Sequence, residues 1–268
     1  MSIKRYTFER ALETKMTKKI IGKVPLERAL SKRGLASRKV ARELIEKGQV
    51  FISGKVIKDP LYMVTPETMD VKIEGHQKAP KFSPLFLVLN KPKSCVCTTK
   101  DEKNRKTVYS YLTHIDQKII SVGRLDFATT GLLFFTNVNR LMDFLTDPKN
   151  EISRSYYVTV RGELTEEKCQ QLCTGLYDQD EFLKAEKVVL KKSSQRESHF
   201  VIILKEGKNR EIRRLLLAIG HEVTALKRIS YGNFELDLEP GESRLVTFKE
   251  LAQKIPETKD LLSKLNLL

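Results

Sequence analysis

Apolar residues first recur at helical spacing between residues 26 and 47. Gly34 is placed to end the first helical stretch, and Ser37 is suited to cap a second helix over residues 38–47. Two short apolar runs then meet at Ser53-Gly54, a dipeptide typical of a tight hairpin turn. The pattern predicts a compact helix–helix–hairpin module over residues 24–76. Its inward-facing helical positions are expected to be Leu26, Ala29, Leu30, Val40, Leu44 and Ile45.

The rest of the chain has strand-like runs separated by short helical stretches. Residues 77–84 contain two prolines and few apolar side chains, which predicts a linker. Residues 85–89 then form a continuous buried-type run, and residues 155–160 alternate strictly, with Tyr156 on the apolar face. A strand-rich second domain is therefore expected over residues 85–268. Further strands are expected at 187–190, 199–204, 223–226, 234–238 and 244–247, and helices at 140–145, after Thr165, at 211–219 and at 257–268.

One stretch of this second domain, residues 123–136 (GRLDFATTGLLFFT), places charge between two apolar runs. Arg124 and Asp126 lie in the loop, although charged side chains are rarely found beside a core unless they are paired. Two interpretations stay open on the residues alone. Either Arg124 and Asp126 close on each other as an internal ion pair, or the loop presents Asp126 as a functional group. A single carboxylate can act as a nucleophile or a base when a neighbouring cation keeps it ionised.

The predicted helix over residues 211–219 carries an arginine at the edge of its apolar face. On a helical wheel Arg213 falls between Leu216 and Leu217, whereas Arg210 and Arg214 point away from the core stripe. A partly buried guanidinium needs an acidic or hydrogen-bonding partner. Asp126 is a candidate for that partner.

The net charge indicates a polyanionic partner. The 268 residues include 49 lysines and arginines against 34 acidic residues, a formal charge of +15. Residues 1–60 alone hold 16 basic and 6 acidic residues, and part of this excess lies on the two predicted helices of the first module. This favours a phosphate-contacting surface, with nucleic acid as the first partner class and a membrane surface as the weaker alternative. The residues expected to form that surface are Lys32, Arg33, Arg38, Lys39 and Arg42.

Motifs for metal or nucleotide chemistry are missing from the sequence. The four cysteines and four histidines have no zinc-site spacing, and the sequence has neither a Walker loop nor a GxGxxG fingerprint. We therefore expect no cofactor. Few cysteines and no apolar run long enough to span a bilayer favour a reducing, cytoplasmic setting. Residues 1–23 are basic and are expected to be an RNA-contacting or flexible extension, since Glu9 and Glu13 argue against a transit peptide.

Two parts of the chain resemble known families. Residues 28–60 (RALSKRGLASRKVARELIEKGQVFISGKVIKDP) look like the S-four-type RNA-binding domain, which is appended to many different proteins. Five further motifs, LNKP at 89–92, VGRLDFATTGLLFFT at 122–136, SYYV at 155–158, EGKNREIRRL at 206–215 and LKRISYG at 226–232, occur in the order seen in the RsuA/RluB/RluF family of ribosomal RNA pseudouridine synthases. That second resemblance covers nearly all of residues 85–248.

The family resemblance assigns roles to several residues. It implies that Asp126 is the catalytic aspartate, that Tyr156 stacks on the target base and that Arg213 is the basic partner of the aspartate. Tyr156 could otherwise be an ordinary core tyrosine. Leu226 resembles the apolar residue that closes the pocket. The remaining substrate contacts that the resemblance implies are Arg124, Lys91 and Arg228.

These observations give one prediction for the whole chain. We expect an α+β protein with a mixed, mainly antiparallel sheet of the pseudouridine synthase fold, preceded by a small α/β RNA-binding domain. The expected reaction is isomerisation of a specific uridine to pseudouridine in ribosomal RNA, with the large subunit as the preferred substrate. We expect a monomer that works on RNA or on an assembling ribosomal subunit. Small-subunit ribosomal RNA or tRNA as substrate, or a non-catalytic ribosome-assembly factor, are the alternatives.

Overall fold

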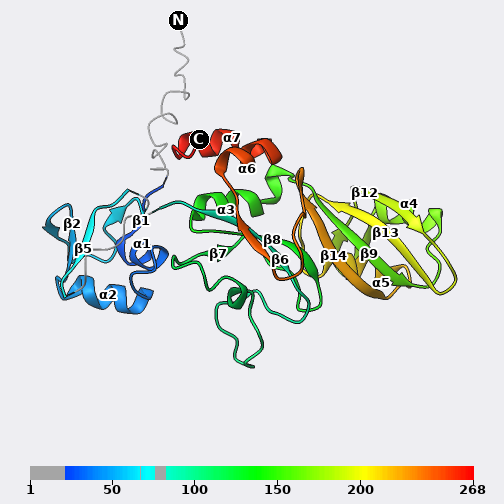
Figure 1. The fold of residues 1–268 in the computed structure, drawn as a ribbon, viewed down its shortest axis with the longest axis horizontal. Coiled ribbons are helices and arrows are strands. Elements are labelled where there is room, and N and C mark those ends of the chain that lie inside the picture. Colours follow the sequence, from blue (N-terminus) through cyan, green and yellow to red (C-terminus); the bar gives the residue numbers. More distant parts are fainter. Residues whose placement is uncertain (1–21, 67, 76–82) are drawn as a thin grey trace, which may run out of the picture. The chain divides into compact units, whose positions relative to one another are not determined.

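The computed structural model describes residues 22–66, 68–75 and 83–268, and the chain divides between residues 82 and 83 into two compact units (Figure 1). The prediction for the basic extension lies almost wholly outside the described residues, as does most of the predicted linker. Within the described part of the chain, no helix is both long and apolar enough to cross a membrane.

The N-terminal unit has the predicted helix–helix–hairpin order. Ser37 caps the second helix, because its hydroxyl oxygen accepts from the backbone N–H of Val40. The hairpin turns at Ser53 (φ 48°) and Gly54 (φ 80°), both left-handed as such a turn requires. Val40 is 46% exposed, so the prediction that it faces inward was wrong; Ala41 takes the buried position one residue later. The elements are β1 Val24–Pro25, α1 Leu26–Lys32, α2 Arg38–Glu46, β2 Val50–Ile52, β3 Lys55–Val56, β4 Met63–Val64 and β5 Val71–Ile73.

Nine of the described strands of the C-terminal unit form one mixed sheet. Its order is β12-β13-β9-β14-β8-β6-β16, with β15 added to β14 and β7 added to β8. The pairing of β14 with β8 is parallel and the other pairings are antiparallel, which confirms the predicted sheet class. The strands are β6 Phe86–Lys91, β7 Ile120–Ser121, β8 Thr130–Thr136, β9 Arg154–Arg161, β12 Lys187–Lys192, β13 Glu197–Leu204, β14 Val223–Tyr231, β15 Phe234–Glu235 and β16 Ser243–Leu245.

Helices and a small hairpin complete this unit. The sequence pattern did not reveal α6, because Thr247, which was assigned to a strand, instead caps this helix by accepting from the backbone N–H of Glu250. The hairpin of β10 and β11 was not predicted either. The elements are η2 Val108–Tyr111, α3 Asn139–Thr146, η3 Pro148–Asn150, α4 Glu166–Thr174, β10 Leu176–Asp178, β11 Glu181–Leu183, α5 Glu211–Ala218, α6 Phe248–Lys254, η4 Pro256–Thr258 and α7 Lys259–Lys264.

The central strands β6 and β8 are buried on both faces of the sheet, which explains their continuous apolar sequence. Phe134 points to one face, where its ring contacts those of Phe86, Tyr231 and Phe234. Leu133 and Phe135 point to the other face and join the core under α5. The apolar side chains of α5 (Ile212, Leu215 and Leu216) and of Ile219, which directly follows this helix, are buried in this same core.

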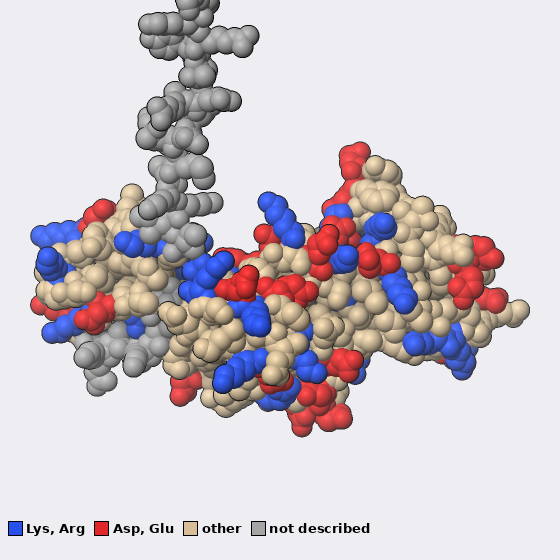
Figure 2. Space-filling view, turned by 90° about the horizontal axis from the view of Figure 1, so that it is seen from above, with Lys and Arg blue, Asp and Glu red and all other residues tan. Residues whose placement is uncertain are grey.

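Charged side chains cover the outside of both units. The face drawn in Figure 2 carries lysine and arginine groups over both units, with acidic groups between them. In the N-terminal unit, Arg38, Lys39 and Arg42 are exposed, while Lys32 and Arg33 are half-buried. Arg42 pairs with Glu27 (Nε–Oε2 2.7 Å), and Arg33 donates to the carbonyl of Met69 (2.9 Å). The predicted RNA-contacting residues therefore combine exposed cations on α2 with one arginine that is tied to the domain's own backbone.

Candidate active site

The loop between β7 and β8 holds Asp126 at the surface of the sheet. Leu125 is buried and anchors the loop, and the backbone N–H of Thr129 donates to the carbonyl of Asp126 (3.0 Å), which closes a tight turn. The backbone N–H of Ser94 donates to the carbonyl of Phe127 (2.9 Å) from the neighbouring segment. The carboxylate of Asp126 is left 39% exposed. The sequence order of apolar strand, charged loop and apolar strand thus leads to a presented carboxylate.

Lys91 lies under this loop and not in the site. It was expected to contact the substrate, yet its side chain is fully buried and does not line the cavity described below. Its ammonium donates to the carbonyls of Thr129 (2.7 Å) and Pro92 (3.1 Å), and burial lowers its pKa. Lys91 is buried because β6 runs two residues further than its apolar pattern and carries this side chain into the interior. Through its bond to the carbonyl of Thr129, Lys91 holds the end of the turn that contains Asp126.

Arg213 approaches Asp126 from α5, as the helical wheel suggested. The two side chains form an ion pair with an Nε–Oδ2 distance of 3.8 Å, and Arg213 also donates to the carbonyl of Val223 (3.2 Å). Burial lowers the pKa of Arg213, the nearby Arg210 lowers it further, and Asp126 opposes both effects. Among the described residues, Arg124 makes no ion pair with Asp126, so the internal pair considered above does not form. Arg124 is instead exposed at the edge of the cavity.

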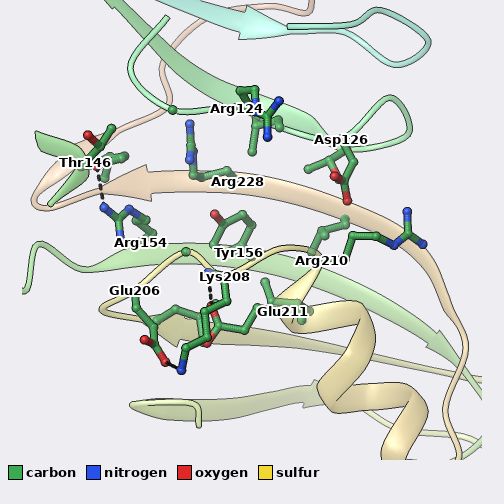
Figure 3. Close-up of a pocket in the computed structure, with 18 of the residues that line it drawn as sticks. Arg124, Asp126, Thr146, Arg154, Tyr156, Glu206, Lys208, Arg210, Glu211 and Arg228 are labelled. Carbon is green, nitrogen blue, oxygen red and sulfur yellow. Dashed lines mark hydrogen bonds and ion pairs between the residues drawn. The ribbon is translucent and has the colours of Figure 1, made fainter. Parts of the chain in front are cut away.

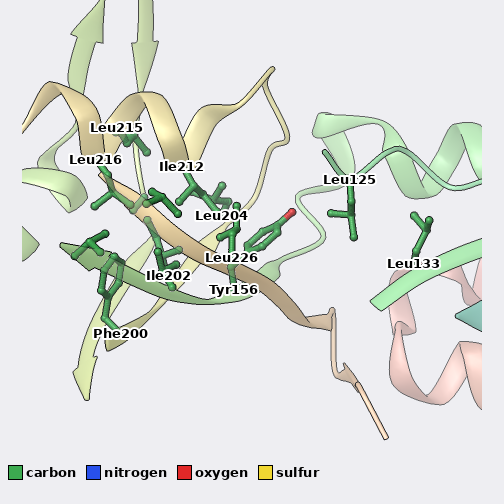
Figure 4. Close-up of a cluster of buried hydrophobic side chains, with 14 of the residues drawn as sticks. Leu125, Leu133, Tyr156, Phe200, Ile202, Leu204, Ile212, Leu215, Leu216 and Leu226 are labelled. Carbon is green, nitrogen blue, oxygen red and sulfur yellow. The ribbon is translucent and has the colours of Figure 1, made fainter. Parts of the chain in front are cut away.

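A cavity of about 340 Å³ opens beside Asp126. In Figure 3 Asp126 and Arg154 lie at opposite sides of it, with Tyr156 and Arg228 between them. Figure 4 shows the Tyr156 ring beside Leu204, Leu226 and Ile212. The wall of the cavity thus combines apolar side chains with many charged ones, which suits a flat ligand that carries polar groups at its edges. The predicted residues that line it are Arg124, Asp126, Tyr156, Arg213, Leu226 and Arg228.

Arg154 and Arg228 are the two buried guanidinium groups of the cavity wall. Arg154 donates to the carbonyls of Lys205 (3.1 Å) and Leu145 (3.2 Å) and to the hydroxyl of Tyr231 (2.9 Å). Arg154 therefore binds the C-terminal turn of α3 to the sheet. Arg154 was not predicted as a site residue, although its position two residues before Tyr156 on an alternating strand places both side chains on one face.

Glu211 is the second group that the sequence analysis missed. It begins α5, is only 3% exposed and lines the cavity. One carboxyl oxygen accepts from the backbone N–H of Lys208 (3.1 Å), and the ammonium of Lys208 pairs with Glu206 (2.6 Å). Burial, together with the neighbouring Glu206, raises the pKa of Glu211 to about 7. In a sequence, an acidic residue at the first position of a helix is already explained by its favourable interaction with the helix dipole. The burial of Glu211 could therefore not be foreseen.

Replacing Glu211 with glutamine should flatten the pH dependence of stability. The folded-state pKa of about 7 lies above the ordinary value of 4.5, so the folded protein holds a proton that the unfolded chain has lost between these pH values. Stability should therefore fall as pH rises through this window, by about 3 kcal/mol in total. Urea denaturation at pH 5 and pH 8 measures this fall, which should disappear in the Glu211→Gln protein.

The matched control for this experiment is Glu163→Gln, which changes an exposed glutamate outside the cavity. It should keep the pH profile of the unmodified protein. Parallel profiles for Glu211→Gln and the unmodified protein would contradict the raised pKa.

Metal ligands do not gather in the described part of the chain: no group of three or more histidine, cysteine, aspartate or glutamate side chains is arranged to hold an ion. The four thiols are unpaired, and burial raises the pKa of Cys95, Cys97 and Cys169. Cys97 lies beneath the site loop, where its sulfur contacts the backbone of Leu125 at 3.3 Å.

Comparison with known proteins gives consistent matches along the chain. Residues 85–218 match the family model described as RNA pseudouridylate synthase, and residues 24–70 match the S4 domain. Ribosomal large subunit pseudouridine synthase B of Bacillus subtilis (strain 168) is 33% identical over 229 residues, which cover 84% of this chain and 93% of the relative. Ribosomal small subunit pseudouridine synthase A of Yersinia pestis is 32% identical over 233 residues, 85% of this chain and 96% of the relative. A crystal structure of a pseudouridylate synthase superposes with a TM-score of 0.59 at 26% identity, covering 87% of this chain and 99% of that one.

Proposed function

The chain belongs to the RNA pseudouridylate synthase family and carries an S4 domain ahead of the synthase region, and on this premise we propose that it converts a specific uridine of large-subunit ribosomal RNA to pseudouridine, with Asp126 as the catalytic residue. The observation that carries the catalytic assignment is the Asp126–Arg213 pair at the mouth of the cavity that Tyr156 and Leu226 line. Relatives that act on the large subunit favour that substrate.

The reaction requires one carboxylate and no external reactant. The Asp126 carboxylate acts at the ribose, either by attack on C1′ or by removal of a proton from C2′, and the bond between C1′ and N1 of the base breaks. The uracil then turns on the Tyr156 ring and its C5 bonds to C1′, as the bond from C1′ to Asp126 breaks or, in the second route, as the proton returns to C2′. The proton lost from C5 is balanced by protonation of N1. Leu226 covers the base from the side of β14, and Arg124 contacts the RNA at the cavity edge.

The RNA must deliver a base that has left its stack. Extrusion of one nucleotide costs about a few kcal/mol, which contacts to the phosphate backbone have to offset. We assign those contacts to the N-terminal unit, with Arg38, Lys39 and Arg42 on α2 and Lys32 and Arg33 at the end of α1. In this scheme residues 24–76 hold the RNA, residues 77–84 link the two domains, and residues 85–268 perform the reaction as a monomer in the cytoplasm.

Arg213→Ala should lower turnover about 100-fold while RNA binding is largely kept. The guanidinium lies 3.8 Å from Asp126, so its loss removes the charge that offsets and orients the carboxylate, whereas it is one of many cations available to phosphate. Tritium release from RNA labelled at C5 of uridine measures turnover, and filter binding measures affinity. Turnover equal to that of the unmodified enzyme would rule out the partner role.

The matched control is Arg214→Ala, one residue further along the same helix. Arg214 lies away from the cavity and pairs with Asp178 and with Glu181 (2.5 Å) on the β10–β11 hairpin. Its removal deletes a guanidinium of the same size from the same helix and should leave turnover within about twofold of normal.

Small-subunit ribosomal RNA is the second candidate substrate, because the Yersinia pestis relative is named for that subunit. Carbodiimide mapping of pseudouridine in both ribosomal RNAs from a strain that lacks this gene decides between the two. One uridine that stays unmodified in the large-subunit RNA is the expected result. If the strain lacks a pseudouridine in the small-subunit RNA or in tRNA instead, that RNA is the substrate. If no pseudouridine is missing and the purified protein releases no tritium, the protein is a non-catalytic RNA-binding protein.

A further inference from the structure

Three buried polar atoms in the described part of the chain have no hydrogen-bond partner, and all three belong to residues that line the cavity. They are Oγ1 of Thr129, Oε1 of Glu211 and Nη2 of Arg228. Buried polar groups in folded proteins are nearly always satisfied, so each exception asks for an explanation. Their concentration around one cavity indicates that a bound group completes them.

Arg228 is the one permanent charge among these three residues. It is 3% exposed, its Nε donates to the carbonyl of Leu132 (2.7 Å), and its guanidinium lies 5.3 Å from the centre of the Tyr231 ring. No carboxylate of the described residues pairs with it within 4.0 Å. A buried cation without an anion is costly unless an anion arrives, because desolvation of the charge is not compensated.

The sheet register places Arg228 beside the ring on which the base is proposed to stack. Arg228 of β14 is directly opposite Tyr156 of β9 on one side and Gly131 of β8 on the other. Residues directly opposite in an antiparallel pair project from the same face with their Cβ atoms about 5 Å apart. Gly131 contributes no side chain, so the side chain directly opposite Arg228 in this row is the Tyr156 ring.

The other arginines of the cavity either have partners within the protein or are exposed. Arg213 pairs with Asp126, and Arg154 is bonded to the carbonyls of Leu145 and Lys205 and to the hydroxyl of Tyr231. Arg124 and Arg210 are exposed at the cavity edge, where water and RNA phosphates reach them. Arg228 is thus the buried arginine of the cavity that still has an unpartnered N–H group.

The proposed reaction produces an anion at this place. When the C1′–N1 bond breaks, its electron pair stays with the base, so the uracil leaves as an anion whose charge is spread over N1, O2 and O4. The charge disappears again when C5 bonds to C1′, C5 loses its proton and N1 gains one. A fixed donor in a dry site stabilises such developing charge more than water does, because it needs no reorganisation.

We propose that Arg228 stabilises the displaced uracil anion, with its unpartnered Nη2 donating to a carbonyl oxygen of the base. The inference rests on the proposed function and assigns to Arg228 a catalytic role in the bond-breaking step. In this scheme Arg213 pairs with Asp126, Arg228 stabilises the leaving base, and the base turns on the Tyr156 ring.

The test compares two leaving groups in single-turnover experiments. The probes are transcripts of the mapped ribosomal RNA fragment made with uridine or with 5-fluorouridine, and loss of the starting nucleoside is followed by chromatography after nuclease digestion. Fluorine at C5 withdraws electrons, so the anion of the fluorinated base is more stable. Its release should therefore depend less on stabilisation by Arg228. Arg228→Met should slow the uridine transcript about 10²- to 10³-fold, and the 5-fluorouridine transcript about tenfold less than that. RNA affinity should stay within about threefold of normal.

Two further variants control for folding and position. Arg228→Lys keeps the charge and should retain more activity than Arg228→Met. Lys227→Ala, an exposed neighbour on the same strand with its side chain on the opposite face, should leave the rate within about twofold of normal. If Arg228→Met does not fold, Arg228→Lys is compared on the two transcripts, and rescue of Arg228→Ala is tried with guanidinium and with urea as the neutral control.

The outcomes separate this inference from the proposed function. A smaller loss for the fluorinated base, or rescue by guanidinium but not by urea, supports the role of Arg228. An equal loss for both transcripts, a loss explained by weaker RNA binding, or equal rescue by urea overturns it. If the unmodified enzyme converts neither transcript, the proposed function fails instead.

Discussion

Asp126→Asn is expected to abolish pseudouridine formation, with a loss of at least about 10⁴-fold, while the protein still folds and binds RNA. Loss of the group that forms or breaks the covalent bond has effects of this size in well-studied hydrolases. Asparagine has the same shape but neither the charge to attack C1′ nor the basicity to take a proton from C2′. The site loop should persist, because its turn is built from backbone hydrogen bonds and from Lys91, and the side chain of Asp126 is 39% exposed.

Two measurements check this expectation. Purified enzyme should release no tritium from RNA labelled at C5 of uridine, and carbodiimide mapping of ribosomal RNA from cells that carry Asp126→Asn should show one site lost. Asp143→Asn is the matched control, since Asp143 is an exposed aspartate on α3 outside the cavity. If every site persists with Asp126→Asn, the catalytic assignment is wrong, whereas loss of RNA affinity would indicate a folding defect.

The relation between Asp126 and Arg213 could be anticipated from local sequence. A charged loop between two buried strands needs a partner, and a helical wheel puts Arg213 at the edge of an apolar face. Each deduction uses only residues within one element. The structure brings the two groups to 3.8 Å across nearly ninety residues of chain. Alternation likewise placed Tyr156 on the buried face of β9.

The burial of Lys91 and Arg228 could not be anticipated in this way. A lysine before a proline and an arginine directly after a lysine both resemble surface positions in a sequence. Their environment is set by strand pairing, since β6 extends under the site loop and β14 lies between β8 and β9. The same limit explains why Glu211 was missed: its burial depends on how the 206–210 segment folds over the start of α5. Cations that look alike in the chain thus differ in surroundings and in proposed role.

The parallel contact between β8 and β14 joins the two halves of the site. Asp126 precedes β8, whereas Tyr156, Arg213, Leu226 and Arg228 all lie on elements on the other side of that contact. The register pairs Lys227 with Thr130 and Arg228 with Gly131, so the glycine lies where the two backbones meet. The distance from the Asp126 carboxylate to the Tyr156 ring therefore depends on how closely β8 approaches β14.

Gly131→Ala should destabilise the C-terminal unit by about 4 kcal/mol and reduce turnover in the protein that still folds. Gly131 has a φ of 104°, which side-chain-bearing residues rarely adopt, and a Cβ there would lie 2.1 Å from the backbone oxygen of Arg228. Backbone strain and overpacking each cost about 1–3 kcal/mol, and here the obstacle is backbone that cannot rotate aside. Relief requires β8 to move from β14, which carries Asp126 away from Tyr156.

Gly220→Ala separates these two causes. Gly220 has a similar φ of 83°, but an added Cβ would meet no described atom within 4 Å, so this substitution introduces strain alone and should cost about 1 kcal/mol. Urea denaturation gives the two losses, and tritium release at equal concentrations of folded protein gives the two rates. Equal losses of stability would mean that the approach of β8 to β14 is not critical. A normal rate with Gly131→Ala would mean that the position of Asp126 does not depend on this contact, because the strand displacement that relieves the clash is the same movement that separates the carboxylate from the base.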